Sequence, residues 1–182
     1  MLRDLILKNR SYRRFRQEKI ELDTLRELVD LARLSASGSN LQPLKYILSC
    51  DPKENAVISP SIGLGGNPPP EERPTAYVII LGDKNIRESA GCDHGIASQS
   101  ILLGAAEKGL GGCIVGNVKR DDLRQALSIP PHLDILLVLA IGKPAENAVI
   151  DAIGPDGSVK GYWDDQKVRH VPKRALDEII LG

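Results

Sequence analysis

A chain of 182 residues with 42% hydrophobic and 26% charged residues has the size and composition of one folded domain, so disorder is not the expected state. Its 24 basic and 24 acidic residues cancel, and the whole protein therefore offers no field that would attract nucleic acid or an anionic membrane. The chain has no stretch near the ~20 apolar residues of a membrane span, no signal-peptide core and no C-x-x-C pair, so we expect a cytoplasmic protein without a disulfide framework or a metal site.

Two helices are expected near the N-terminus. The apolar residues within 2–6 mark one face of a short helix. Apolar residues at helical spacing across 25–32 predict a second helix, with Asp23 as its N-cap. The small polar residues 35–40 follow this helix and predict a loop with exposed backbone N–H groups.

Two apolar strands are expected on either side of a long excursion. Residues 46–49 and 76–81 have the composition of strands. Between them, residues 51–74 contain three glycines and a triple proline. This composition predicts a lid or a poorly ordered loop.

A central helix is expected over residues 95–108, where small residues would permit close contact with neighbouring elements. The glycines at 109–112 follow this helix, whereas those of a dinucleotide-binding fingerprint precede one. We therefore expect a helix C-cap at Gly109 and a tight turn. A turn whose backbone approaches a flat ligand would also need glycine, so a binding role stays open.

The remaining elements indicate an α+β fold. Residues 113–116 and 135–141 read as strands and residues 121–127 as a helix, and the chain beyond 144 is polar and extended. Helices and strands alternate without a regular βαβ pattern, and no domain boundary is evident. We expect a single domain over residues 1–182.

Side-chain chemistry is sparse, while both ends of the chain are basic. Residues 3–19 contain seven basic and two acidic residues, and a second basic cluster contains Lys167, Arg169, Lys173 and Arg174. Such runs can be solvated faces, or they can converge on one anionic ligand. No nucleophile elbow and no metal-ligand spacing is present, so a cofactor would have to carry any redox chemistry.

Two polar segments match the two ends of a possible ligand. Arginine side chains and a serine at residues 10–13, together with Lys173 and Arg174, suit a phosphate group. The loop at residues 37–40 offers backbone donors and an amide that suit a ring with carbonyl and N–H groups. The two segments together predict a ligand with a phosphate at one end and a heteroaromatic ring at the other.

These segments, in this order, resemble the nitroreductase family of FMN enzymes. Five passages carry the resemblance across nearly the whole chain: Asn9-Arg10-Ser11-Tyr12-Arg13-Arg14-Phe15, the loop from Ser35 to Pro43, Glu72 to Tyr77, the helix and glycines leading to Gly116, and His170-Val171-Pro172-Lys173-Arg174. The chain departs from the family pattern at Asn9, Ala36 and Leu44, where arginine, proline and tryptophan are usual.

The resemblance implies a fold and a site. The implied fold is a nitroreductase-like three-layer sandwich, with a central mixed or antiparallel sheet flanked by helices, forming a homodimer with C-terminal arm exchange. The implied site lies at the dimer interface. Arg10, Ser11, Lys173 and Arg174 would hold the FMN phosphate and ribityl chain, Arg13 would lie near the pyrimidine ring, Ser37, Gly38 and Asn40 would reach the flavin from the partner, and the backbone of Val115 and Gly116 would face flavin N5.

The resemblance also implies an activity. NADH or NADPH would reduce FMN, which would then reduce a small nitroaromatic or quinone-like acceptor in a ping-pong cycle, with no side chain serving as an indispensable acid or base. Two alternatives stay open. The chain could bind flavin without turnover, as a reservoir or sensor, or it could be a non-flavin domain whose basic ends bind another phosphorylated ligand.

Overall fold

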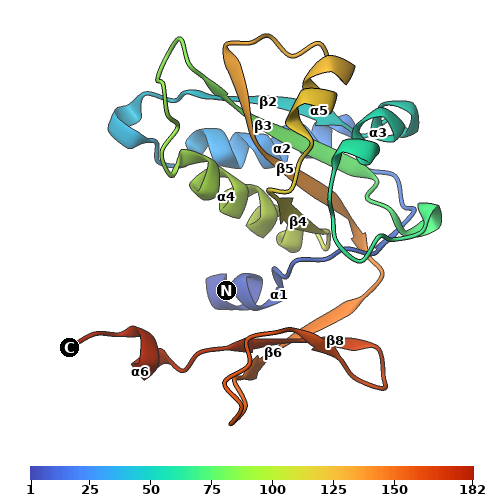
Figure 1. The fold of residues 1–182 in the computed structure, drawn as a ribbon, viewed down its shortest axis with the longest axis vertical. Helices are drawn as coiled ribbons and strands as arrows, with labels where there is room; N and C mark the ends of the chain where they lie inside the picture. Colours follow the sequence, from blue (N-terminus) through green and yellow to red (C-terminus); the bar gives the residue numbers. More distant parts are fainter.

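A five-stranded sheet forms the centre of the computed structural model, which describes residues 1–182 (Figure 1). Its strands are β1 (Phe15–Arg16), β2 (Leu44–Ser49), β3 (Ala76–Asp83), β4 (Gly111–Val115) and β5 (Leu133–Pro144). Strand β5 pairs with β1, β3 and β4, and β2 pairs with β3. Every ladder in this sheet is antiparallel.

The sheet is the middle layer of three. Helices α2 (Leu22–Leu34) and α4 (Asp93–Glu107) cover one face, and α3 (Pro52–Ile58) and α5 (Arg120–Ala126) pack on the other (Figure 1). Strand β3 is almost entirely buried because both of its faces are covered. The predicted α+β three-layer sandwich is confirmed.

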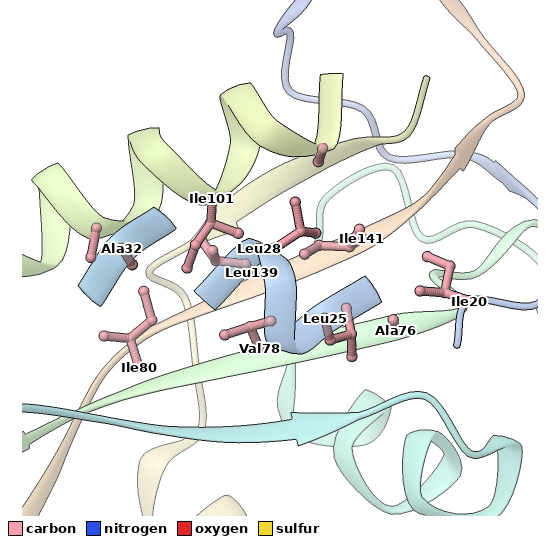
Figure 2. Packing of buried hydrophobic residues seen from close by; sticks show 12 residues of the cluster. Ile20, Leu25, Leu28, Ala32, Ala76, Val78, Ile80, Ile101, Leu139 and Ile141 are labelled. Carbon is pink, nitrogen blue, oxygen red and sulfur yellow. The ribbon is translucent and has the colours of Figure 1, made fainter. Parts of the chain in front are cut away.

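Successive residues of β3 enter different cores. Val78 and Ile80 pack with Leu25 and Leu28 of α2 and with Ile101 of α4 (Figure 2). The residues between them on the strand point to the other face, as the two-residue period of a strand requires. The two apolar layers hold the sheet rigidly between the helices.

Helix α4 lies close to α2 and ends at the predicted position. A Cβ added at Gly104 would lie 2.3 Å from Leu31 Cδ1, so glycine permits the close approach of the two helices. Gly109 follows the helix C-cap residue and has a φ of +69°, in the left-handed region. The predicted glycine-containing turn is therefore confirmed.

Two local predictions are wrong. Helix α2 begins at Leu22 after Glu21, and Asp23 lies in its first turn, where it accepts a hydrogen bond from Arg26 instead of capping the helix. Residues 51–74 do not form a poorly ordered loop, while the alternative that they act as a lid stays a prediction. They contain α3, capped by the Asp51 side chain, and the 3-10 turns Ser59–Ser61 and Pro70–Glu72, and Ile58 is only 1% exposed.

Both ends of the chain lie outside the sandwich. Helix α1 (Leu2–Lys8) lies between the core and a second sheet of three strands, β6 (Asn147–Ala152), β7 (Tyr162–Trp163) and β8 (Val168–Lys173) (Figure 1). The short helix α6 (Leu176–Ile179) follows this sheet. No helix has the length and apolar character of a membrane span.

Candidate functional site

The N-terminal basic segment is bonded to the first residues of β4. Ser11 forms a parallel bridge with Gly112, and the backbone N–H of Tyr12 donates to the Gly112 carbonyl at 3.0 Å. Directly after the segment, Phe15 is fully buried on β1. The polar residues 10–13 are thus fixed to the sheet at both ends.

Arg10 has an unused donor. Its Nη2 donates to the Ile6 carbonyl, while its Nε is buried and has no hydrogen-bond partner within the chain. A buried N–H without an acceptor is costly, and a bound acceptor would remove that cost. This atom is suited to an anionic ligand such as a phosphate.

The Arg13 guanidinium forms no salt bridge, although Glu146 accepts a hydrogen bond from the Arg13 backbone N–H. Its Nε donates to the Leu64 carbonyl at 3.1 Å and its Nη1 to the Ser11 carbonyl at 3.2 Å, and it forms no salt bridge. The neighbouring Arg14, in contrast, is paired with Glu72. Arg13 is therefore not paired with a surface carboxylate, and its charge is available to a ligand.

A basic residue from the C-terminal sheet joins this group. Arg169 of β8 donates through Nη1 to the Ser11 carbonyl at 2.9 Å. Burial and the nearby charge of Arg13 lower the pKa of Arg169. Two guanidinium groups thus donate to one carbonyl oxygen. Glu146 offsets part of this positive charge, and a bound anion would offset more of it.

A cleft of about 680 Å³ opens beside the two arginines, between the core and the C-terminal sheet. Its lining includes Arg13, Arg169, Lys167, Glu146 and Trp163. The sequence placed Arg169 in the second basic cluster, but the resemblance selected other members of that cluster. Only the folded C-terminal sheet shows that Arg169 is the member of the basic cluster that lies beside Ser11.

Lys173 and Arg174 lie farther along the arm. Lys173 is four residues beyond Arg169 on β8, which corresponds to roughly 13 Å of strand. Arg174 is exposed and pairs with Glu178 at 3.5 Å. No contact within one chain brings either residue to Ser11, and their phosphate role stays a prediction.

The loop at residues 37–40 lies against the first residue of α4. The Ser37 hydroxyl donates to Asp93 Oδ2 at 2.6 Å, and the Gly38 N–H donates to Asp93 Oδ1 at 2.9 Å. These two donors are therefore used within the chain. Asn40, with the neighbouring Ser39, is exposed and has its side chain free of such contacts.

Val115 and Gly116 lie where β4 ends. Val115 is buried in the core opposite Val138 of β5, so its side chain is unavailable to a ligand. Gly116 is exposed, and its carbonyl accepts hydrogen bonds from Val118 N–H and from Arg120 Nη2. A contact with flavin N5 would have to come from the backbone N–H groups, as predicted, and this stays untested.

One chain does not bring the two predicted binding segments together. The loop at residues 37–40 contacts Asp93 at the start of α4, and the segment at residues 10–13 contacts Gly112 just beyond its end. A helix of 15 residues spans about 22 Å. The segments thus belong to opposite ends of the same helix.

Comparison with known proteins identifies the family. A sequence profile of the nitroreductase family matches residues 6–71 and 64–143, which is well over half of the chain. This chain belongs to the nitroreductase family. The match covers the N-terminal segment, the loop at residues 37–40 and the whole core sheet, while the C-terminal sheet lies beyond it.

Several members of the family are similar over most of this chain. An FMN reductase (NADPH) from Bacillus subtilis (strain 168) is 26% identical over an alignment of 165 residues. The alignment covers 78% of this chain and 65% of the relative, so the chain spans less than two thirds of that relative. A protein named as an NADH dehydrogenase/NAD(P)H nitroreductase from Methanothermobacter thermautotrophicus is 28% identical over an alignment of 161 residues, which covers 84% of this chain and 83% of the relative.

A solved structure shares the fold. A nitroreductase from Exiguobacterium sibiricum 255-15, in complex with FMN, superimposes with a TM-score of 0.69 at 16% identity, covering 80% of this chain and 89% of that chain. At this identity the likeness concerns the fold alone.

Proposed function

We propose that this nitroreductase-family protein is an FMN-dependent NAD(P)H oxidoreductase with its flavin at the interface of a homodimer. The observation that carries the proposal is that Arg10 and Arg13, on either side of Ser11, form no salt bridge within the chain. Arg10 Nε is buried without an acceptor, and the Arg13 guanidinium has no carboxylate partner. Two unneutralised arginines on one short segment fit an anionic ligand far better than they fit a solvated surface.

The proposed roles of Arg10, Ser11 and Arg13 rest on where these residues lie. The roles of Lys173 and Arg174 rest on the family resemblance. Arg10 and Ser11, with Lys173 and Arg174, hold the phosphate end, and Arg13 lies at the pyrimidine ring, where a positive charge favours the reduced flavin. Bound FMN would supply the hydride chemistry, accepting electrons from NADH or NADPH and passing them to a second substrate. The protein binds, orients and shields it, and no side chain acts as an obligatory acid or base.

The homodimer follows from the distance between the two binding segments. Because the loop containing Asn40 and the segment containing Arg10 lie at opposite ends of α4, one FMN ring system draws them from two chains. The C-terminal arm offers a surface suited to a partner. Its apolar side chains are largely exposed in one chain: Val159, Tyr162, Trp163, Leu176, Ile179, Ile180 and Leu181.

The acceptor is proposed to be a small nitroaromatic or quinone-like molecule, reduced in a ping-pong cycle after the oxidised nucleotide, NAD(P)+, has left. The relative from Bacillus subtilis is named as an FMN reductase that uses NADPH, which supports the reductant more than the acceptor. Three free cysteines fit the reducing cytoplasm as the place of action.

An anaerobic absorbance spectrum of the FMN-reconstituted protein tests the proposal. Bound FMN gives a yellow protein, and addition of NADH or NADPH should bleach it. A subsequent pulse of nitroaromatic or quinone should restore the colour. Bound flavin that neither nucleotide bleaches would identify a non-catalytic flavin-binding protein, and a protein that binds no FMN would refute the proposal.

Dilution tests the shared site. If each flavin contacts both chains, FMN binding and dimer formation stabilise each other by mass action. Light scattering should then report a dimer, and dilution below its dissociation constant should release FMN. A monomer with full flavin occupancy would contradict the interface site.

A further inference from the structure

The loop at residues 37–42 has a backbone conformation that is uncommon for residues other than glycine. Ser39, Asn40 and Gln42 have φ values of 53°, 56° and 52°. Residues with a side chain adopt the left-handed region at a cost in free energy, and such residues persist where the surrounding structure imposes them. Three of them within four positions require an external support.

Asp93 is that support. It is the first residue of α4, lies 55 residues from Gly38 in sequence and is 3% exposed. One carboxylate oxygen accepts a hydrogen bond from the Ser37 hydroxyl at 2.6 Å, and the other accepts one from the Gly38 N–H at 2.9 Å. The Ser37 oxygen in turn accepts the Gln42 N–H at 2.9 Å, which closes the loop.

The surroundings keep Asp93 ionised. Burial alone raises the pKa of this carboxyl group, but the hydrogen bonds from Ser37 and Gly38 and the positive charge of Arg87 outweigh burial, so the pKa is lowered. Arg87 also fills the space beside Gly38, since a Cβ there would lie 2.7 Å from Arg87 Nη1. A carboxylate that accepts two hydrogen bonds is the form that this loop requires.

We infer that Asp93 is a positioning residue, which shapes the loop so that Ser39 and Asn40 are presented to the flavin of the partner subunit. The inference rests on the proposed function for its ligand. It assigns Ser37 and Gly38 an internal role, because their donors are spent on Asp93, and it leaves the exposed Ser39 and Asn40 as the groups that contact the ring.

Asp93→Asn is the sharpest perturbation. The amide has nearly the same shape, but its nitrogen cannot accept a hydrogen bond, so either the Ser37 hydroxyl or the Gly38 N–H loses its acceptor. We expect the FMN dissociation constant, measured by fluorescence titration on folded protein, to rise at least about tenfold. In the flavin-free protein, hydrogen exchange at the amides of Gly38 and Gln42 should accelerate.

Ser37→Ala breaks the same network from the other side. It should weaken FMN binding similarly, and Asp93→Asn combined with Ser37→Ala should be no worse than the poorer single variant, since both remove one unit. Leu123→Ala is the control for stability, because Leu123 is fully buried on the opposite face of the sheet. Asp121→Asn is the control for a carboxylate in the first turn of a helix.

Both controls should retain the wild-type affinity for FMN, even though Leu123→Ala lowers the melting temperature. The inference is overturned if Asp93→Asn leaves the dissociation constant unchanged, if Leu123→Ala raises it equally, or if exchange at Gly38 and Gln42 is unaffected. A wild-type protein that binds no FMN would instead refute the proposed function, and with it the ligand assigned to the loop. The exchange measurement on flavin-free protein would still decide whether Asp93 holds the loop.

Discussion

Phe15 anchors the proposed binding segment to the sheet, and one glycine makes room for it. Phe15 is fully buried on β1. A Cβ added to Gly142 on β5 would lie 2.7 to 2.9 Å from three carbon atoms of Phe15, closer than real Cβ contacts come. Gly142 has no positive φ, so its backbone would accept alanine, and the Phe15 side chain, Cβ included, requires the glycine.

Phe15→Ala should lower the free energy of unfolding by about 3–5 kcal/mol, the usual cost of emptying a buried phenylalanine site. For a domain of this size each kcal/mol corresponds to about 2–4 °C, so the melting temperature should fall by roughly 6–20 °C. Differential scanning calorimetry on flavin-free protein measures this change. Flavin binding should weaken as well, because residues 10–13 directly precede the lost anchor.

Gly142→Ala should cost less free energy when Phe15 is truncated. With Phe15 present, the methyl group collides with Cβ, Cγ and Cδ1 of this residue and should destabilise the protein by about 1–3 kcal/mol. In the Phe15→Ala variant, the contacts with Cγ and Cδ1 are gone and only the contact with Cβ remains, so the destabilisation should be smaller.

Gly95→Ala is the matched control, because a Cβ there meets nothing within 4 Å. It should change stability by the same amount in both backgrounds. The explanation is refuted if Gly142→Ala costs the same free energy whichever residue occupies position 15.

Three further predictions concern charge. Arg13→Gln should lower the reduction potential of bound FMN by tens of millivolts, about 30 mV for each 1.4 kcal/mol, because this guanidinium has no salt bridge. Arg14→Gln is the control, since Arg14 is paired with Glu72, and a potential that spectroelectrochemistry finds unchanged in Arg13→Gln would show that Arg13 does not lie at the flavin. Arg174→Ala should leave the melting temperature nearly unchanged, since the only ion pair of Arg174 is exposed, but should raise the FMN dissociation constant about tenfold. An unchanged dissociation constant would show that Arg174 does not bind the phosphate. Hydrogen bonds to Asp164 and Asp151 raise the pKa of His170, so the stabilisation from these contacts is complete below pH ~6.5 and is lost as pH rises through the higher folded-state pKa. Hydrogen exchange in β8 should rise over that range, and His170→Gln should abolish this pH dependence.

The buried strands were predictable from sequence because burial on both faces leaves a continuous apolar run. Residues 76–81 and 135–141 were recognised as strands, and the observed strands extend them to Asp83 and Pro144 at ends that are less buried. Helix α4 was recognised by its small apolar residues. Element ends were less accurate, as Asp23 shows, because a cap depends on local geometry that composition does not contain.

The C-terminal sheet and the helix within residues 51–74 escaped prediction for a different reason. Strands β6, β7 and β8 are largely half-buried or exposed and carry no clear apolar alternation. Their pairing depends on contacts such as that of His170 with Asp151, which lie far apart in sequence. The role of Asp93 was missed for the same reason, since its partners are 55 and 56 residues away.

Both proposed binding segments are attached to one continuous unit, α4 followed by β4. The loop containing Asn40 is held by Asp93, the first residue of α4, and the segment containing Arg10 is bonded to Gly112, the second residue of β4. Strand β4 is paired with β5, the strand with the most partners in the sheet. The distance between the two segments within one chain is therefore set by the core. If the proposed site draws one segment from each chain, such preorganisation would reduce the entropy lost when FMN binds.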